Sequence, residues 1–592
     1  MSHATTLSQV SYIEFGSCSG WLHASWGDIG VLMCAGVGRD STLGDMAVRL
    51  LAVKLAQSGF PTLRFDYPGT GDSLDLETDD PCDAWLASID MAADVLKQNG
   101  VRQLVFCGVR LGAMLAALKA RERDDVCAVV LVDAVTSGAR YLRELQIATH
   151  LIAKSSEIVV DTLRIDGVSL RTDRNAPFRA LDLPSMEKLP AKHVLILDSE
   201  PSFTTKKLAD RLRGLGSKVT EQAFEALTDY DKNGYVPRTS NISAVSDWLL
   251  SVMSPNPKQY VALDPLVINR ASGERFLEKP LHFGPSGRLF GMLCQPKEAD
   301  HSSLVVIIGN AGAASHHGVN RFHVTLARCL AAVRIASLRF DFSGLGESLP
   351  KEIDEVNHVY ETDRVSDIKA AIDIMENIGY RQFAVGGLCS GAFHAWRAVL
   401  QDNRIEILFL LNPAVFSWRK GQPFTQLINI SNRSTRFYIS TMRSRRGWKR
   451  LFRGELNVVR ALRTLSSHAG RRLVALGSQA IAALGLSIEE DFPDRSMRRL
   501  ARRGVRTLVA VGIDDGGLDI VQSHFGKKGH RLTQLPGCSV VLLPSIDHTL
   551  TLEPMRVAAA EVIVSFLAEA FPSDKTEPSL KGDDPTPIAG EP

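Results

Sequence analysis

The chain has 592 residues, with 68 basic and 66 acidic side chains, and hydrophobic residues make up 45% of it. These ordinary values exclude a mainly disordered, collagenous or disulfide-scaffold chain, and a net charge of +2 argues against a chain-wide nucleic-acid binder. The nine cysteines lack metal-ligand spacing, so we expect free thiols, no structural metal and a cytoplasmic location. The first residues do not form a signal peptide, and no apolar run reaches the ~18 residues of a spanning helix.

Residues 8–252 alternate short apolar runs with amphipathic helical patterns, which predicts a mostly parallel sheet with helices on both faces. The motif LRFDYPGTGDS, which contains Asp66, follows one such run. Further on, GVRLG forms a glycine-flanked turn between a predicted strand and a predicted helix. Its central residue is Arg110, whose guanidinium stays charged and cannot attack a carbonyl group.

The same landmarks recur in the same order in residues 262–571. LRFDFSGLGES contains Asp341, and GLCSG surrounds Cys389. The distance from the aspartate to the centre of the glycine turn is 110 − 66 = 44 residues in the first copy and 389 − 341 = 48 in the second. We therefore predict two tandem α/β domains, 8–252 and 262–571, followed by a disordered tail at 572–592. The ligand site of each domain is expected at the carboxyl ends of its strands.

The best candidate nucleophile is Cys389, between a predicted strand and a predicted helix. Glycines two positions before and after it allow a strained turn that projects the thiol above the sheet. A buried cysteine in a tight turn is the alternative interpretation. Downstream, Asp515 and His548 each follow an apolar strand, in the order nucleophile, acid, base. This order predicts that His548 activates the Cys389 thiol and that Asp515, or alternatively Asp514, orients the imidazole.

Backbone N–H groups near the nucleophile are expected to stabilise a developing oxyanion. One is the N–H of Ser390, directly after the nucleophile, and the other comes from Gly312 or Ala311 in the loop after the first long strand of the second domain. His316 and His317 follow in that loop, where they either line the pocket or lie on the surface.

These residues resemble the α/β-hydrolase superfamily, most closely its serine-aminopeptidase-like (S33-type) branch, and also members with a cysteine nucleophile such as dienelactone hydrolases. The motifs that carry the resemblance are NAG, LRFDFSGLGES, GLCSGA, GIDDGG and DHTLT. It covers most of residues 270–570 and, in degraded form, residues 20–250. In that family the positions of Cys389, Asp515 and His548 form the catalytic triad, and this chain departs from it by carrying cysteine where most members have serine.

By the same alignment the first domain has lost its chemistry. Arg110 occupies the nucleophile position, Glu200 or Pro201 the acid position, and Lys232 the histidine position. We therefore predict that the domain is a pseudoenzyme that acts as a scaffold, a dimerisation unit or a ligand-binding unit. Binding of an anionic group by Arg110 is a further alternative.

Residues 415–500 form an insertion where the resemblance implies a helical cap over the pocket. Between Arg419 and Arg472 this segment has 14 basic residues and a single acidic one. A solvated basic face would explain this density, but we favour an anionic partner for Arg443, Arg445 and Arg446. The candidates are a substrate carried on coenzyme A or an acyl-carrier protein, an anionic glycan, and a membrane surface; no recognisable nucleic-acid module is present.

The sequence thus predicts a hydrolase that acts on ester or thioester bonds through an acyl-thioenzyme and needs no cofactor. An acyl-cysteine is itself a thioester, so exchange with a thioester substrate is nearly balanced in energy. The alternatives are an acyltransferase with the same triad, and a non-catalytic binding or scaffold protein. The sequence does not predict an oligomeric state.

Overall fold

The structure is a computed structural model that describes residues 10–571, apart from residues 419–491 and several short gaps. The gaps lie at 77, 79, 157–162, 166, 175, 225–227, 232–233, 238, 258–259, 262–274, 298–303, 352–358 and 361–363. The predicted tail, most of the predicted cap and Lys232 therefore fall outside the described residues. Among the helices that are described, none combines the length and the apolar character needed to cross a membrane.

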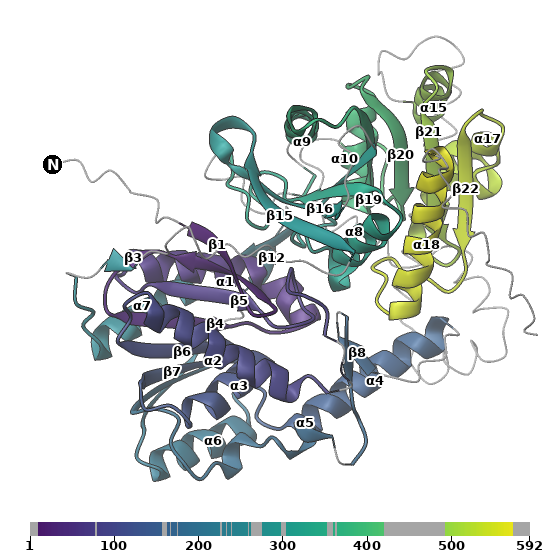
Figure 1. Ribbon diagram of the computed structural model, residues 1–592. Helices are drawn as coiled ribbons and strands as arrows, with labels where there is room; N and C mark the ends of the chain where they lie inside the picture. Colours follow the sequence, from purple (N-terminus) through teal and green to yellow (C-terminus); the bar gives the residue numbers. More distant parts are fainter. Residues whose placement is uncertain are drawn as a thin grey trace, which may run out of the picture.

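Each half of the chain contains one large sheet (Figure 1). Both sheets have eight strands, in the same order. The first sheet runs in the order β1 (Val10–Phe15), β2 (Cys18–His23), β5 (Thr62–Asp66), β4 (Ile29–Cys34), β6 (Gln103–Val109), β7 (Val126–Val132), β10 (His193–Asp198) and β11 (Lys218–Ala223). The second runs in the order β15 (Phe276–Phe283), β16 (Leu289–Pro296), β18 (Ala336–Phe340), β17 (Leu304–Gly309), β19 (Gln382–Leu388), β20 (Ile405–Leu411), β21 (Arg506–Gly512) and β22 (Cys538–Leu543).

Helices cover both faces of each sheet. One face of the first sheet carries α1 (Arg39–Gln57) and α7 (Thr239–Val252), and the other carries α2 (Cys82–Gln98), α3 (Leu111–Ala120) and α6 (Phe203–Gly214). One face of the second sheet carries α8 (Phe322–Ala332) and α18 (Glu553–Ala570), and the other carries α9 (Val365–Ile378), α10 (Ser390–Val399), α15 (Pro493–Arg502) and α16 (Gly516–Phe525). The end of α4 (Gly138–Ser156) reaches from the first domain to the core of the second.

The two-sided cover explains why the strands read as continuous apolar runs. In β17, Val305 and Ile307 pack under α9 and α10, whereas Val306 and Ile308 pack under α8 and α18. Only the second strand of each sheet, β2 or β16, runs antiparallel to both of its neighbours. The other pairs are parallel, as expected for strands buried on both faces. The prediction of two α/β domains is confirmed.

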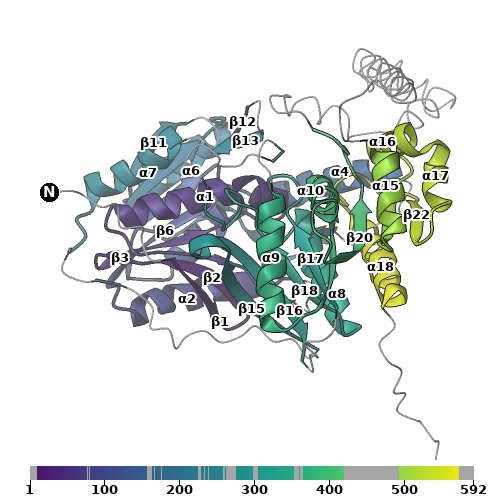
Figure 2. The ribbon, with the colours of Figure 1, turned by 90° about the horizontal axis from the view of Figure 1, so that it is seen from above.

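The antiparallel ends of the two sheets meet at the domain boundary, where Figure 2 shows β1 and β2 close to β15 and β16. The apolar part of this contact consists of Tyr12 and Trp21 from the first domain with Phe290 and Met292 from the second. The rings of Trp21 and Phe290 pack edge to face, with their centroids 4.6 Å apart. Buried aromatic contacts of this kind stabilise the boundary by the hydrophobic effect and by ring geometry.

Two reciprocal ion pairs flank these aromatic residues. Arg64 of the first LRFD motif donates from Nη1 to Oε1 of Glu347 at 2.7 Å. Arg339 of the second LRFD motif donates from Nη2 to Oδ1 of Asp72 at 2.6 Å. Asp72 and Glu347 are the acidic residues that end the two glycine turns of the repeat. The two copies of one sequence motif therefore bind each other in an approximately two-fold manner.

Candidate active site

Cys389 lies in the turn between β19 and α10, at the carboxyl edge of the second sheet. Its backbone has a φ of 57° and a ψ of −110°, a conformation that L-residues rarely adopt. A Cβ atom on Gly387 would lie 2.8 Å from the backbone of Gly391, and one on Gly391 would lie 2.9 Å from the backbone oxygens of Gly309 and Asn310, at the end of β17. Only glycine fits both positions, so the predicted nucleophile turn is present around Cys389.

The structure brings Asp515 and His548 together. Asp515 caps the N-terminus of α16, where its Oδ1 accepts a hydrogen bond from the backbone N–H of Gly517 at 2.7 Å. Its Oδ2 accepts a hydrogen bond from Nδ1 of His548 at 2.8 Å. Asp515, rather than the alternative Asp514, thus holds the imidazole, and its hydrogen bond to Nδ1 leaves Nε2 as the nitrogen able to exchange a proton with a nucleophile.

Cys389 and His548 shift each other's pKa in opposite directions. Burial raises the pKa of the Cys389 thiol, but the neighbouring His548 imidazolium and the Tyr360 hydroxyl together outweigh burial, so this pKa lies below its ordinary value. Burial lowers the pKa of His548, but the Asp515 carboxylate and the Cys389 thiolate raise it well above its ordinary range. Nε2 of His548 makes no hydrogen bond of standard geometry to the described residues, so the two side chains interact mainly by charge. These shifts favour a thiolate–imidazolium pair.

The other eight cysteines behave differently. All lie in the described part of the chain as free thiols, and burial raises the pKa of each one. A thiol with a raised pKa is a poor nucleophile at neutral pH because little thiolate is present. Cys389 is therefore the one cysteine of this chain whose surroundings favour the reactive form.

The predicted oxyanion donors lie close to Cys389, but one of them is occupied. The backbone N–H of Gly312 donates to Oγ of Ser390 at 2.7 Å. The N–H of Ala311, which the sequence left as the alternative, has no such partner among the described residues. Ser390 is the first residue of α10, so its N–H has no acceptor within the helix. Ala311 and Ser390 are thus better placed than Gly312 to offer donors to an oxyanion.

Tyr360 also lies at the site, although no sequence motif points to it. Its hydroxyl oxygen lies 3.7 Å from Sγ of Cys389, and its ring packs against Trp418 and Phe393 with centroid separations of 5.0 and 5.4 Å. Burial and the Cys389 thiolate raise the pKa of Tyr360, so its hydroxyl keeps its proton and can donate to sulfur. The backbone of the preceding residue is fixed as well, because the carbonyl oxygen of Val359 accepts a hydrogen bond from Nε2 of His394 at 2.8 Å.

Arg110 occupies the equivalent turn of the first domain, between β6 and α3. Its Nη1 donates to the backbone oxygen of Asp133 at 3.3 Å. The strand registers place Ser202, which caps α6, where Asp515 caps α16. The expectation of Glu200 or Pro201 at the acid position is wrong by one or two residues, because the alignment did not take the helix cap into account.

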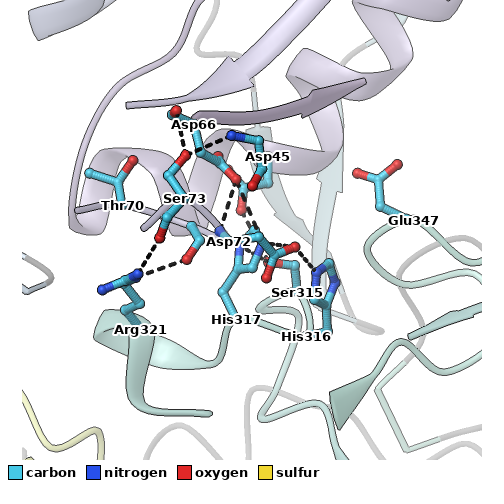
Figure 3. Close-up of polar contacts among 12 residues, drawn as sticks. Asp45, Asp66, Thr70, Asp72, Ser73, Ser315, His316, His317, Arg321 and Glu347 are labelled. Carbon is cyan, nitrogen blue, oxygen red and sulfur yellow. Dashed lines mark hydrogen bonds and ion pairs between the residues drawn. The ribbon is translucent and has the colours of Figure 1, made fainter. Parts of the chain in front are cut away.

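His316 and His317 lie at the boundary between the domains (Figure 3). His316 is only 1% exposed, so it is not a surface loop residue. Nε2 of each ring faces Oδ2 of Asp72, and these three ligand atoms lie within 4.8 Å of one another, a spacing that could suit a metal ion. However, both nitrogens of His316 and both oxygens of Asp72 already bind protein groups. The cluster is thus satisfied as a network of ion pairs and hydrogen bonds.

The basic residues expected to contact an acyl carrier, Arg443, Arg445 and Arg446, lie outside the described residues. Their proposed role rests on sequence alone.

The chain matches no protein-family model and no curated protein. It is similar in structure to a putative hydrolase from Agrobacterium vitis, at 18% identity and a TM-score of 0.30, over 42% of this chain and 98% of that one. An esterase from Pyrococcus furiosus aligns at 16% identity and a TM-score of 0.29, over 41% of this chain and 90% of that one. Est1E from Butyrivibrio proteoclasticus, solved with ferulic acid, aligns at 18% identity and a TM-score of 0.30, over 41% of this chain and 98% of that one.

Proposed function

We propose that the second domain of this two-domain α/β chain hydrolyses ester or thioester bonds through an acyl-enzyme on Cys389, as its resemblance to the α/β-hydrolase superfamily implies. The observation that carries the proposal is the strained turn that presents Cys389 near His548, whose Nδ1 lies 2.8 Å from Oδ2 of Asp515. A thiolate is the nucleophilic form of cysteine, and an imidazolium beside it is a ready proton donor.

In the first half of the reaction the Cys389 thiolate attacks the carbonyl carbon of the substrate. A carbon–sulfur bond forms, and the carbonyl oxygen becomes an oxyanion that the N–H groups of Ala311 and Ser390 stabilise. The intermediate then breaks its bond to the alkoxide or thiolate leaving group, which takes the proton from His548. The product of this half is an acyl-cysteine beside a neutral imidazole.

In the second half, water attacks the acyl-cysteine. His548 accepts a proton from the water as its oxygen bonds to the carbonyl carbon, and Asp515 stabilises the imidazolium that forms. The carbon–sulfur bond breaks, the carboxylic acid leaves, and the thiolate–imidazolium pair is restored. An acyltransferase would follow the same steps with an alcohol, amine or thiol acceptor in place of water.

Thioesters are the favoured substrates because the acyl-cysteine is itself a thioester, so the first step is nearly balanced. We propose that the acyl group arrives on an anionic carrier such as coenzyme A or an acyl-carrier protein. The density of arginine and lysine between residues 419 and 472 supports this choice. Replacing Arg443, Arg445 and Arg446 with serine should weaken turnover of acyl-coenzyme A several-fold more than turnover of a neutral p-nitrophenyl ester; equal losses would contradict the assignment.

The main test compares cysteine reactivity with turnover. Iodoacetamide should alkylate Cys389 at pH 6.5 at least tenfold faster than the exposed Cys329, because only Cys389 has a lowered pKa. His548→Ala should abolish this difference, and Cys389→Ala should abolish turnover of p-nitrophenyl acetate and acetyl-coenzyme A. If Cys389 reacts no faster than Cys329 and no ester is turned over, the chain is a non-catalytic protein. Product analysis with added alcohols distinguishes transfer from hydrolysis.

A further inference from the structure

The loop after β17, residues 310–317, runs from the candidate site to the first domain. At its start, Gly312 donates its N–H to Oγ of Ser390 at 2.7 Å, directly beside the nucleophile turn. The side-chain amide of Asn310 donates to the backbone oxygen of Ala314 at 2.8 Å and to Oδ1 of Asp341 at 2.7 Å. These contacts make the loop a compact unit whose position depends on Asp341. We call it the oxyanion loop because it contains the N–H of Ala311.

The other end of the oxyanion loop is held by two carboxylates. Nδ1 of His316 lies 2.8 Å from Oδ2 of Asp341. Nε2 of the same ring lies 2.7 Å from Oδ2 of Asp72, which belongs to the first domain (Figure 3). Ionised carboxylates only accept hydrogen bonds, so both ring nitrogens carry protons and the ring is an imidazolium. Burial lowers the pKa of His316, but Asp72 and Asp341 raise it to about 10.

Asp72 is the centre of this contact. It is 2% exposed, and its Oδ1 accepts from Nη2 of Arg339 at 2.6 Å while Nε2 of His317 lies 3.2 Å from its Oδ2. One buried carboxylate of the first domain thus compensates cations of the second. Removing its charge would leave His316 with Asp341 and Arg339 with Glu278, so each buried cation would lose one of its carboxylate partners, a change that displaces them or destabilises their surroundings.

We propose that Asp72 is a positioning residue, through which the first domain holds the oxyanion loop of the second domain in its working position. The path runs from Asp72 through His316 and Asp341 to Asn310, and then to the adjacent N–H of Ala311. Each step is a buried hydrogen bond, so a displacement at one end is transmitted to the other. The inference rests on the proposed function, because only an acyl-transfer reaction needs an oxyanion donor there. It gives the domain that lacks a nucleophile a role in the reaction of the other.

The first experiment compares Asp72→Asn with Glu347→Gln in the full chain. Both substitutions remove one charge from the reciprocal pairs at the domain boundary, but the Glu347 side chain binds Arg64, not the oxyanion loop. Asp72→Asn should lower kcat for p-nitrophenyl acetate roughly tenfold to hundredfold, as expected for a displaced oxyanion donor. Glu347→Gln should stay within twofold of the unchanged protein. The alkylation rate of Cys389 should stay within twofold in both variants, because the thiolate–imidazolium pair is intact.

The second measurement works even if no ester is turned over. Hydrogen exchange of the amides in residues 311–315 should become faster in Asp72→Asn and stay unchanged in Glu347→Gln. Equal kcat values and equal exchange in the two variants would overturn the inference, as would a loss of Cys389 alkylation in Asp72→Asn alone. If the unchanged protein shows no turnover while the exchange difference is present, the proposed function fails and the coupling of the loop to the first domain stands. Loss of loop protection on treatment with EDTA, restored by zinc, would overturn the inference in favour of a metal site.

Discussion

The two domains build the same strained turn around different side chains. Cys389 has a φ of 57° and a ψ of −110°, and Arg110 has a φ of 54° and a ψ of −119°. The flanking glycines are required in both: in the first domain a Cβ atom on Gly108 would lie 2.3 Å from the backbone of α3, and one on Gly112 would lie 2.1 Å from a backbone oxygen of β4. The first domain therefore has the same strained turn around a side chain that is no nucleophile.

Packing explains the backbone conformation of the two turns, whereas reactivity depends on the side chains around them. In both turns the strand, the turn and the helix pack so closely that they fix the backbone conformation. The strain is therefore present whichever side chain stands at the centre. Reactivity depends on the neighbours of the turn, and among the described residues these differ between the two domains. Cys389 lies beside His548, and Asp515 holds that ring, whereas Ser202 occupies the acid position of the first domain. A strained turn alone is thus no evidence of catalysis, and the proposal for the second domain depends on the side chains that surround Cys389.

The largest expected difference in activity is between two alanine variants, one at the centre of each turn. Cys389→Ala should lower kcat/KM for p-nitrophenyl acetate by ~10³-fold or more, because the nucleophile is lost. Arg110→Ala should leave kcat/KM within twofold, because Nη1 of Arg110 donates to the backbone oxygen of Asp133 within its own domain, and a guanidinium is no nucleophile. A comparable loss in both variants, measured with proteins of unchanged circular dichroism, would show that the first domain takes part in the chemistry directly.

A second substitution weakens the neighbours of Cys389 and leaves the turn intact. In Asp515→Asn, His548 loses the carboxylate that raises its pKa, so less imidazolium is present at neutral pH. The Cys389 thiol then loses the cation that lowers its pKa, and this loss outweighs the smaller direct effect of the Asp515 charge. The pH profile of alkylation should therefore move to higher pH, and kcat should fall ~10²–10⁴-fold. Asp514→Asn is the matched control, for which both should stay unchanged.

The reciprocal ion pairs at the domain boundary should differ in their contribution to stability. The Arg339 side chain is 0% exposed, so Arg339→Met leaves Asp72 and Glu278 buried without it and should cost about 3–5 kcal/mol of unfolding free energy. The Arg64 side chain is 12% exposed, and its partner Glu347 also has Arg49 nearby, so Arg64→Met should cost less, about 1–3 kcal/mol. Urea denaturation measures both values. Equal losses would contradict the difference in burial.

Local signals in the sequence account for the part of this structure that could be predicted. The buried runs, the glycine turns and the order of Cys389, Asp515 and His548 at strand ends are properties of short segments. Strand ends of one parallel sheet lie at one edge, so these segments converge without further information. The acid position of the first domain was predicted one or two residues before Ser202, because the cap of α6, and not the end of β10, marks the equivalent of Asp515.

Contacts made only in the tertiary structure could not be predicted. Tyr360 comes before α9 in a stretch without periodicity, and the fold brings its hydroxyl to the thiol. His316 and Asp72 are separated by 244 residues and meet only because the two domains pack on each other. The sequence around a loop histidine does not indicate whether its ring faces solvent or a buried carboxylate. Both contacts depend on packing, which no short segment encodes.

The smallest expected effect tests whether Tyr360 belongs to the chemistry that distinguishes the second domain. Tyr360→Phe keeps the ring that packs on Trp418 and removes only the hydroxyl 3.7 Å from Sγ of Cys389. That hydroxyl helps to lower the pKa of the thiol, so its loss should raise the pKa and slow alkylation at pH 6.5 about two- to tenfold, the value of roughly one hydrogen bond. The same variant at pH 10, where the thiol is ionised regardless, should react at the rate of the unchanged protein. A loss that persists at pH 10 would mean that the hydroxyl supports the fold of the site and not the charge on sulfur.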